Sequence, residues 1–430
     1  CGIVIRISDY SMIVQKILVG NNKNINQKNY IWNMIAGILN ASEAIILSFA
    51  IMRITGLEDA GILTMAFAAA NLFVTVGKYG VRNYQVTDVE GISFSTYKYA
   101  RYITVMIMIA ISLGYIINGV WNRGYTFYKS GCIFSMCLIL AVEAVEDVYA
   151  AKYQRMGRLD IGAKFFIIRW LGILSSYTVV LIVSRNLLIA SVIAVCISLV
   201  IFEACKYMVE PQFRDTEKKT SIYKLLKECL PLCVSMFFSY YICNAPKYAI
   251  DKYMSDTEQA CFGFVAMPVF AVRLLSTFIY QPIVVQLSDE WKNKEYKKVN
   301  IRVKRQIMMI GLLSLACVLG AYFIGIPILS ALYNTDLRGY KTELLLMVFG
   351  GGMLAMVNFF ELLLIIMRKQ KSIIICYLIC SLGAMICFPF GAIRYQTCGV
   401  AVIYNFIIAT LMILLGTLTI IYFKKAEKVG

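Results

Sequence analysis

The feature that most constrains the fold is a series of apolar runs, each about twenty residues long, that recurs along the chain. An α-helix of that length matches the hydrocarbon core of a bilayer, which is ~30 Å thick. Helices are expected because a segment in lipid must satisfy its own backbone hydrogen bonds. With 60% hydrophobic and 16% charged residues, a water-soluble protein of 430 residues could not cover its surface. The sequence therefore predicts an all-α polytopic membrane protein with about twelve transmembrane helices.

The predicted spans are 31–52, 61–77, 102–120, 130–151, 161–182, 186–205, 229–250, 260–287, 305–325, 343–366, 373–391 and 399–423. Lys and Arg concentrate in the segments that lie on one side of the membrane if the N-terminus is cytoplasmic. Cytoplasmic loops carry such an excess of basic residues. Because the number of spans is even, we expect both termini in the cytoplasm.

The chain divides at its most charged connecting segment into two halves of six predicted spans. After the first span of each half a short segment recurs, in which Glu58 and Ala60 match Glu258 and Ala260. Both halves begin on the same side of the membrane, as in a parallel repeat about an axis along the membrane normal. The predicted parts are a cytoplasmic N-terminal segment (1–30), an N-lobe (31–205), a cytoplasmic linker (206–228), a C-lobe (229–423) and a cytoplasmic tail (424–430).

Composition argues against several classes of function. The net charge of +17 is not carried by a basic soluble domain, so it indicates contact with anionic lipid headgroups rather than nucleic acid. Histidine, the commonest metal ligand and general base, is absent. Most of the 14 cysteines lie inside apolar runs, where cysteine acts as a small hydrophobe. No loop is long enough to form a catalytic domain. We expect no enzyme activity, no metal and no cofactor.

Ionisable residues inside predicted spans are costly, so they face a partner or a cavity. The fourth span carries Glu143, Glu146 and Asp147 on one helical face, and the fifth carries Lys164 and Arg169. From the short cytoplasmic loop between these antiparallel spans, Glu143 and Arg169 are equally deep, about 12 Å at ~1.5 Å per residue. Asp147 and Lys164 match nearer the surface. The sequence predicts Glu143–Arg169 and Asp147–Lys164 pairs, either as a structural network or as a gate or proton-linked site.

Two cations in the second half have no obvious acidic partner at their depth. Arg273 lies in the middle of the eighth span, and polar residues continue its face toward one end: Ser276, Thr277, Tyr280 and Gln281. Such a stripe indicates a water-filled lumen. Lys247 lies one turn from Asp251, which could neutralise it, or its side chain could extend to the membrane surface.

Other polar residues lie on single helical faces of predicted spans. Asn40 and Asn71 belong to polar stripes in the first two spans, and such stripes either line a cavity or pack helices together. Glu43 in the first span and Glu361 in the tenth are harder to explain by packing alone. Prolines occur in or beside the second-half spans, where they provide fixed bends or permit bending during a transport cycle: Pro231, Pro246, Pro268, Pro282, Pro327 and Pro389.

Five stretches resemble a known family. They are NYIWNMIAG (29–37), GLEDAG (56–61), GKYGVRNYQVTD (77–88), QRMGRLD (154–160) and NAPKYAID (244–251). From about residue 27 onward the chain resembles bacterial polysaccharide biosynthesis flippases. These are O-antigen and capsule repeat-unit translocases of the multidrug/oligosaccharidyl-lipid/polysaccharide exporter superfamily. The resemblance implies two six-helix lobes around a central cavity that opens alternately to either side of the bacterial cytoplasmic (inner) membrane.

The resemblance also implies a cargo, an undecaprenyl-diphosphate-linked oligosaccharide for lipopolysaccharide or other surface polysaccharide biosynthesis. A diphosphate in hydrocarbon needs cations, so its expected contacts are Arg273, Arg169, Lys247, Lys78 and Arg82. Arg169 would drop out if Glu143 pairs with it fully. Asn40, Asn71 and Tyr280 would meet sugar hydroxyls. Coupling or gating would fall to Glu43, Glu143, Asp147 and Glu361.

The implied protein is a monomer whose partners are membrane lipids, a polysaccharide polymerase and a chain-length regulator. One alternative is a cation-coupled multidrug exporter of the same superfamily, which the acidic residues favour. The other is a membrane-embedded polymerase or glycosyltransferase. Those enzymes carry larger outer loops than this chain has.

Overall fold

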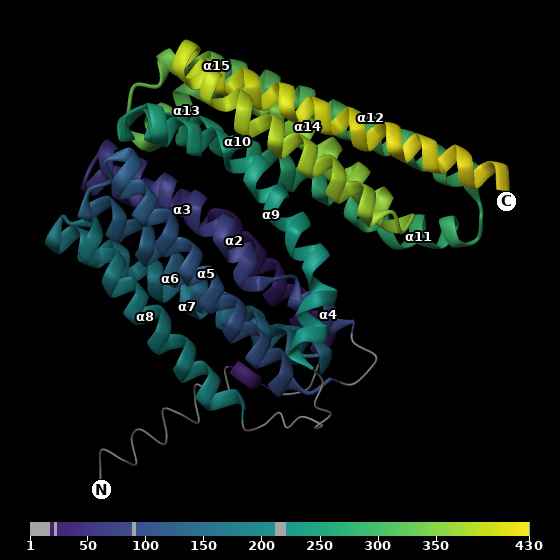
Figure 1. Cartoon of the computed structure of the whole chain (residues 1–430), viewed down its shortest axis with the longest axis horizontal. Helices are drawn as coiled ribbons and strands as arrows, with labels where there is room; N and C mark the ends of the chain where they lie inside the picture. Colours follow the sequence, from purple (N-terminus) through teal and green to yellow (C-terminus); the bar gives the residue numbers. More distant parts are fainter. Residues whose placement is uncertain (1–17, 21–23, 88–91, 211–220, 430) are drawn as a thin grey trace, which may run out of the picture. The chain divides into compact units, whose positions relative to one another are not determined.

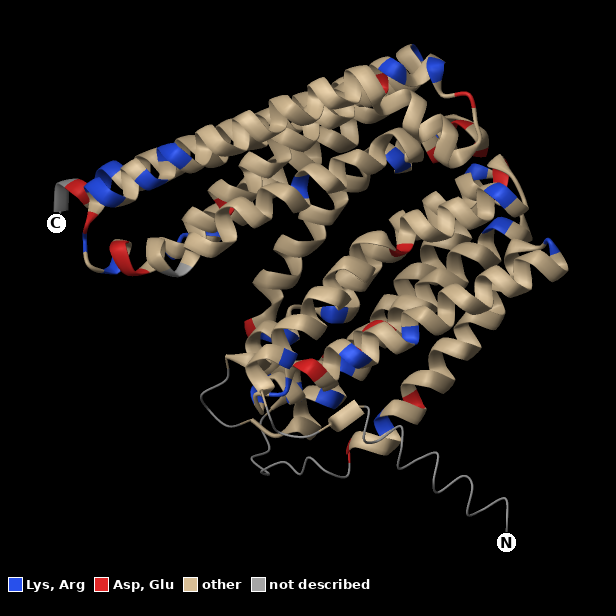
Figure 2. Cartoon of the chain, turned by 180° about the vertical axis from the view of Figure 1, so that it is seen from behind, with Lys and Arg blue, Asp and Glu red and all other residues tan. Residues whose placement is uncertain are grey.

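The computed structural model describes residues 18–20, 24–87, 92–210 and 221–429, and all the regular elements in these ranges are helices (Figure 1). No strand occurs among the described residues. In the described ranges, ten helices are long and apolar enough to cross a membrane. Lys, Arg, Asp and Glu are sparse along the helices and gather mainly toward helix ends (Figure 2). The predicted all-α, multi-pass membrane fold is confirmed.

The chain forms two compact units, Cys1–Phe237 and Phe238–Gly430, that meet within one helix. The helices of unit 1 are α2 (Ile25–Ile54), α3 (Leu57–Lys78), α4 (Val81–Val86), α5 (Phe94–Arg123), α6 (Phe127–Arg155), α7 (Leu159–Ser184) and α8 (Leu187–Val209). Helix α9 (Ile222–Tyr253) begins in unit 1 and ends in unit 2. Residues 211–220 of the predicted linker lie outside the described residues.

Helix α6 is the centre of unit 1, since it packs against α3, α4, α5, α7 and α8. Its sequence combines small and apolar residues, and about two thirds of its positions are buried. The three acids of the fourth predicted span lie on this helix. Side chains from the helices around α6 are therefore the available partners for its polar face.

Unit 2 contains, after α9, these elements: α10 (Asp256–Tyr280), the short 3₁₀ helix η2 (Gln281–Ile283), α11 (Val284–Lys292), α12 (Tyr296–Gly320), the π-helix η3 (Ala321–Gly325), α13 (Ile326–Tyr333), η4 (Arg338–Tyr340), α14 (Lys341–Ile366) and α15 (Gln370–Val429). Helix α14 is central and packs against α10, α12 and α15. Three consecutive glycines, 350–352, allow this contact, since an added Cβ would meet Tyr404, Val269 and Ser314 in turn.

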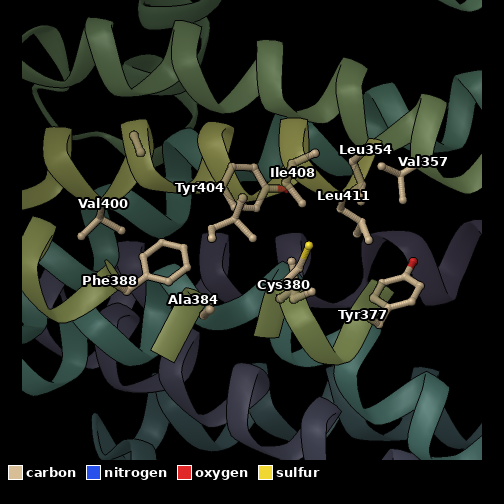
Figure 3. Packing of buried hydrophobic residues seen from close by; sticks show 14 of the residues in the cluster. Leu354, Val357, Tyr377, Cys380, Ala384, Phe388, Val400, Tyr404, Ile408 and Leu411 are labelled. Carbon is tan, nitrogen blue, oxygen red and sulfur yellow. The ribbon is translucent and has the colours of Figure 1, made fainter. Parts of the chain in front are cut away.

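Helix α15 contains two spans that fold back on each other. Its backbone leaves helical geometry at Gln396, where φ is 52°. Gly391 and Gly399 lie so close across this turn that a Cβ on Gly399 would be 2.5 Å from the Gly391 carbonyl oxygen. Figure 3 shows Cys380, Ala384 and Phe388 facing Val400, Tyr404 and Ile408 in the core of unit 2.

Each of the twelve predicted spans falls almost entirely on helix in the structure. The ten membrane-length helices among the described residues become twelve when α15 is counted as two spans and α6, which carries three acids, is included. One predicted boundary is wrong. The eighth span was expected to run to residue 287, but α10 ends at Tyr280. Pro282 lies in the 3₁₀ turn that follows, where it cannot donate a helical hydrogen bond.

Replacing Gly399 with alanine should destabilise unit 2, because the new Cβ has backbone of Gly391 on one side and Tyr395 on the other. Overpacking of this kind costs ~1–3 kcal/mol. The measurement is the midpoint of thermal unfolding in detergent. Gly114→Ala is the matched control, since a Cβ there meets nothing within 4 Å. An unchanged midpoint for G399A would show that the hairpin is not packed this closely.

Candidate functional site

Asp147 on α6 joins three segments of unit 1. Its Oδ1 accepts a hydrogen bond from Arg82 Nη1 at 3.0 Å, and its Oδ2 accepts one from Arg101 Nη2 at 2.9 Å. Arg101 has no exposed area, and its other terminal nitrogen donates to the Gly77 carbonyl oxygen at 2.8 Å. Arg82 also donates to Gln154 at 2.9 Å. Asp147 thus holds α4 and α5 against α6.

Glu143, one turn earlier on α6, binds a second pair of cations. Lys78 Nζ lies 2.9 Å from its Oε1, and Arg169 Nη2 lies 3.0 Å from its Oε2. The Trp170 indole donates to the same Oε2 at 3.1 Å. Arg169 Nε also pairs with Glu146. The predicted Glu143–Arg169 pair is confirmed, and Arg169 is completely buried between two carboxylates.

The predicted Asp147–Lys164 pair is wrong. Lys164 lies near Asp160, one turn before it on α7, with 3.2 Å between Nζ and Oδ2. Its Nζ also donates to the Leu18 carbonyl oxygen at 2.9 Å. Equal depth on two helices did not identify the partner, because Arg82 and Arg101 from other helices occupy both oxygens of Asp147.

We refer to this network as the unit 1 charge cluster, with members Lys78, Arg82, Arg101, Glu143, Glu146, Asp147 and Arg169. It contains four cations and three acids. Glu43 on α2 is a fourth acid that interacts electrostatically with Glu143, Arg169 and Lys78. Glu43 is 7% exposed, and its Oε2 has no hydrogen-bond partner among the described residues. An ionised Glu43 would balance the cluster, and a protonated one would leave it with one excess positive charge.

In unit 2 the candidate charges on spanning helices include Arg273 on α10 and Glu361 on α14. Arg273 on α10 forms no ion pair with any described residue, although it interacts electrostatically with Glu361 on α14. Its guanidinium lies 5.5 Å from the centre of the Phe270 ring. Glu361 accepts a hydrogen bond from the Tyr377 hydroxyl at 3.1 Å. The carboxylate is therefore already oriented by a neighbour, whereas the guanidinium of Arg273 is available to another anion.

Lys247 on α9 is half-buried and forms no hydrogen bond or ion pair within the described parts of the chain. Asp251 does not neutralise it. An ammonium group in this position attracts anions more strongly than one that is already paired.

The remaining predicted contacts differ in exposure. Asn40 on α2 is exposed. Asn71 on α3 is half-buried and donates to the Phe67 carbonyl oxygen at 2.9 Å. Its side-chain amide nitrogen is therefore already hydrogen-bonded within its own helix. Tyr280 is 8% exposed and packs 5.6 Å from the Phe359 ring. Ser276, expected beside it on a lumenal face, is fully buried and donates to the Val272 carbonyl oxygen.

Sequence reasoning missed Arg101 and the pairing of Lys78 and Arg82 with α6. A signal was present, since Lys78 and Arg82 are four residues apart, as are Glu143 and Asp147. The segment that carries Lys78 and Arg82 runs in the same direction as α6. The equal spacing therefore pairs Lys78 with Glu143 and Arg82 with Asp147. Arg101 carries no such signal. Within the described ranges no group of three or more Cys, Asp or Glu side chains is placed to bind a metal.

No protein-family model matches the sequence, and no curated protein matches it. Solved structures do match over most of the chain. The lipid II flippase MurJ in an inward closed conformation has a TM-score of 0.70 and 12% identity, covering 92% of this chain and 90% of MurJ. The MATE multidrug transporter DinF-BH in complex with R6G has a TM-score of 0.62 and 15% identity, covering 92% of this chain and 95% of that one.

A third match is the inward-facing conformation of a multidrug resistance MATE family transporter of the MOP superfamily. Its TM-score is 0.62 at 11% identity, with 90% of this chain and 96% of that chain covered. The chain has the fold of MOP-superfamily transporters. The three structures named here are transporters, one of them a flippase, and not enzymes.

Replacing Asp147 with asparagine should strongly destabilise the protein. Arg101 is fully buried, and removing one partner of a buried ion pair costs ~3–5 kcal/mol. The matched control is Asp336→Asn, because the side chain of Asp336 is 74% exposed and lies 3.8 Å from Arg338. The measurement is retention of monodisperse protein after graded heating in detergent. Equal stability of the two variants would contradict an essential role for the Asp147 contacts.

Proposed function

We propose that this protein is a flippase that moves undecaprenyl-diphosphate-linked oligosaccharide units from the cytoplasmic to the outer leaflet for surface polysaccharide biosynthesis. The observation that carries the proposal is that Arg273 and Lys247 are half-buried cations and form no ion pair among the described residues. The fold supports it, since MurJ, a lipid II flippase, has the same architecture.

A diphosphate explains why such cations would be retained inside a membrane protein. An unpaired charge in a spanning segment costs ~2.5–3.5 kcal/mol on insertion scales, so it needs a compensating role. A lipid-linked diphosphate brings negative charge into that environment, and arginine can bind its oxygens through two nitrogens. In this proposal Arg273 is the principal contact of the diphosphate and Lys247 supplies a second positive charge.

Residues of unit 1 have a different role in this proposal. The side chains of Lys78 and Arg82 are 28% and 36% exposed while they pair with acids, so they can attract the cargo without losing their partners. Arg169 has no exposed area and two carboxylate partners, and we leave it out of the cargo contacts. Asn40 and Asn71 are the proposed sugar contacts. Tyr280 is the weakest candidate because its ring packs against Phe359.

The proposed movement is alternating access. MATE transporters of this fold are known in inward-facing and outward-facing conformations. The proposed setting is a bacterial cytoplasmic membrane with both termini inside, where the basic connecting segments meet anionic lipid. A polysaccharide polymerase and a chain-length regulator are the proposed partners on the product side.

A specific observation favours a second candidate, a cation-coupled multidrug exporter. Glu43 is buried, close to a cluster with one excess cation, and its Oε2 lacks a hydrogen-bond partner. Such a carboxyl can take up and release a proton or accept a cation. The same residue could also couple a flippase to an ion gradient, so Glu43 alone does not separate the two candidates.

Arg273→Ala should abolish surface glycan while leaving the amount of protein in the membrane unchanged, because the diphosphate loses its main cationic contact. Arg273→Lys should retain part of the activity, since charge remains but two-nitrogen binding is lost. Surface glycan would be measured in cells that depend on this chain for display. Lys371→Ala, at an exposed position at the start of α15, is the matched control. Normal display with R273A would rule out its cargo role.

Glu43→Gln should remove any dependence of transport on a proton gradient, because glutamine cannot exchange a proton. The assay uses proteoliposomes with and without an imposed pH gradient and follows either a lipid-linked oligosaccharide or a cationic dye. Gradient-stimulated dye export that E43Q abolishes would favour the exporter. Oligosaccharide transfer that ignores both the gradient and E43Q would show that Glu43 has no coupling role.

A further inference from the structure

A second polar site lies in unit 2, at the end opposite α11 (Figure 1). There the structure has an open groove of about 760 Å³ between the π-helix η3, α13, η4 and the start of α14. Its lining is Tyr322, Phe323, Ile326, Pro327, Ser330, Asn334, Thr335, Asp336, Arg338 and Lys341. None of these residues belongs to the proposed cargo or coupling set.

The sequence accounts for the shape of this groove. Pro327 has no N–H to donate, and in a regular α-helix its ring would collide with the carbonyl of residue 323. The π-helix Ala321–Gly325 ends two positions before Pro327 and widens the turn at this point. Gly325 lets the widened turn approach α14, since an added Cβ would lie 2.7 Å from Leu344. Single π turns inserted in α-helices are frequent at functional sites.

The polar side of the groove carries net positive charge. The side chain of Arg338 is 88% exposed and is held only loosely by Asp336, with 3.8 Å between Nε and Oδ1. Lys341 is exposed, and its Nζ lies 4.1 Å from the centre of the Tyr322 ring. One acid therefore faces two cations, which suits a ligand group with a negative charge. Lys341 also covers the ring face on which a sugar would stack, which disfavours a glycan.

The other side of the groove is apolar and exposed. Phe323 is 71% exposed and Ile324 is 56% exposed on the π turn, and Ile328 is 55% exposed on α13. Ile324 and Ile328 lie on the same helical segment as Phe323, which lines the groove. A ligand that satisfies both sides has a phosphate at one end and hydrocarbon at the other.

We propose that this groove binds an anionic phospholipid, with its phosphate between Arg338 and Lys341 and an acyl chain along Phe323 and Ile324. The site is separate from cargo transport and does not rest on the proposed function. It would fix a lipid on the segment where α12 changes to α13 through a π turn.

The test uses the full chain purified in detergent, with bound lipids counted by native mass spectrometry during titration with phosphatidylglycerol or phosphatidylcholine. Each basic residue near an anionic lipid surface changes binding about fivefold, so R338A/K341A should weaken one phosphatidylglycerol site by about 25-fold. Lys252→Ala combined with Arg394→Ala is the matched control. It removes the same charge from two exposed positions outside the groove. The control should leave this site intact.

Two further experiments distinguish a bound phospholipid from other anionic ligands. Phe323→Ser should weaken phosphatidylglycerol binding, and soluble glycerol phosphate should compete poorly because it lacks the acyl chain. The proposal is overturned if R338A/K341A binds phosphatidylglycerol like the unaltered protein, or if the control pair weakens it equally. It is also overturned if phosphatidylcholine binds as well, if glycerol phosphate competes fully, or if a soluble oligosaccharide displaces the lipid.

Discussion

The contact on which unit 1 depends is the one between Asp147 and Arg101. Both groups lie on spanning helices, where an unpaired charge is poorly hydrated and therefore costly. Arg101 is fully buried and divides its donors between Asp147 and the Gly77 carbonyl oxygen, which ties α5 to α6 and to the end of α3. Because α6 also packs against α3, α4, α7 and α8, the contact between Asp147 and Arg101 fixes α5 to the central helix of the unit.

Most of the fold was predictable because the membrane leaves the backbone few choices. A long apolar segment must form a helix, so hydropathy alone placed twelve spans that the structure contains. The boundary after Tyr280 was not predictable in the same way. The apolar pattern continues through residue 287, and the helix ends earlier for a local reason, the proline at position 282. The turn at Gln396 was predicted as a break between spans, although its close Gly391–Gly399 contact was not.

The candidate site was predictable only in part, because depth along a helix says nothing about direction around it. Depth was enough for Glu143 and Arg169, whose helices are neighbours with facing side chains. It failed for Asp147, whose partners come from α4 and α5. The matching four-residue spacing of Lys78 with Arg82 and of Glu143 with Asp147 contained the missing information. Reading it requires knowing that α3 and α6 lie side by side, which is tertiary structure.

The two units differ in what their positive charges can do. Using Arg101 or Arg169 to hold a diphosphate would strand carboxylates of α6 inside the membrane, which costs more than a new contact returns. Arg273 has no ion pair to give up among the described residues, so binding an anion there breaks nothing. Glu43 is the reverse case, an acid whose ionisation decides whether its cluster is neutral. This difference is the physical reason for proposing Arg273 as the principal cargo contact and Glu43 as a coupling residue.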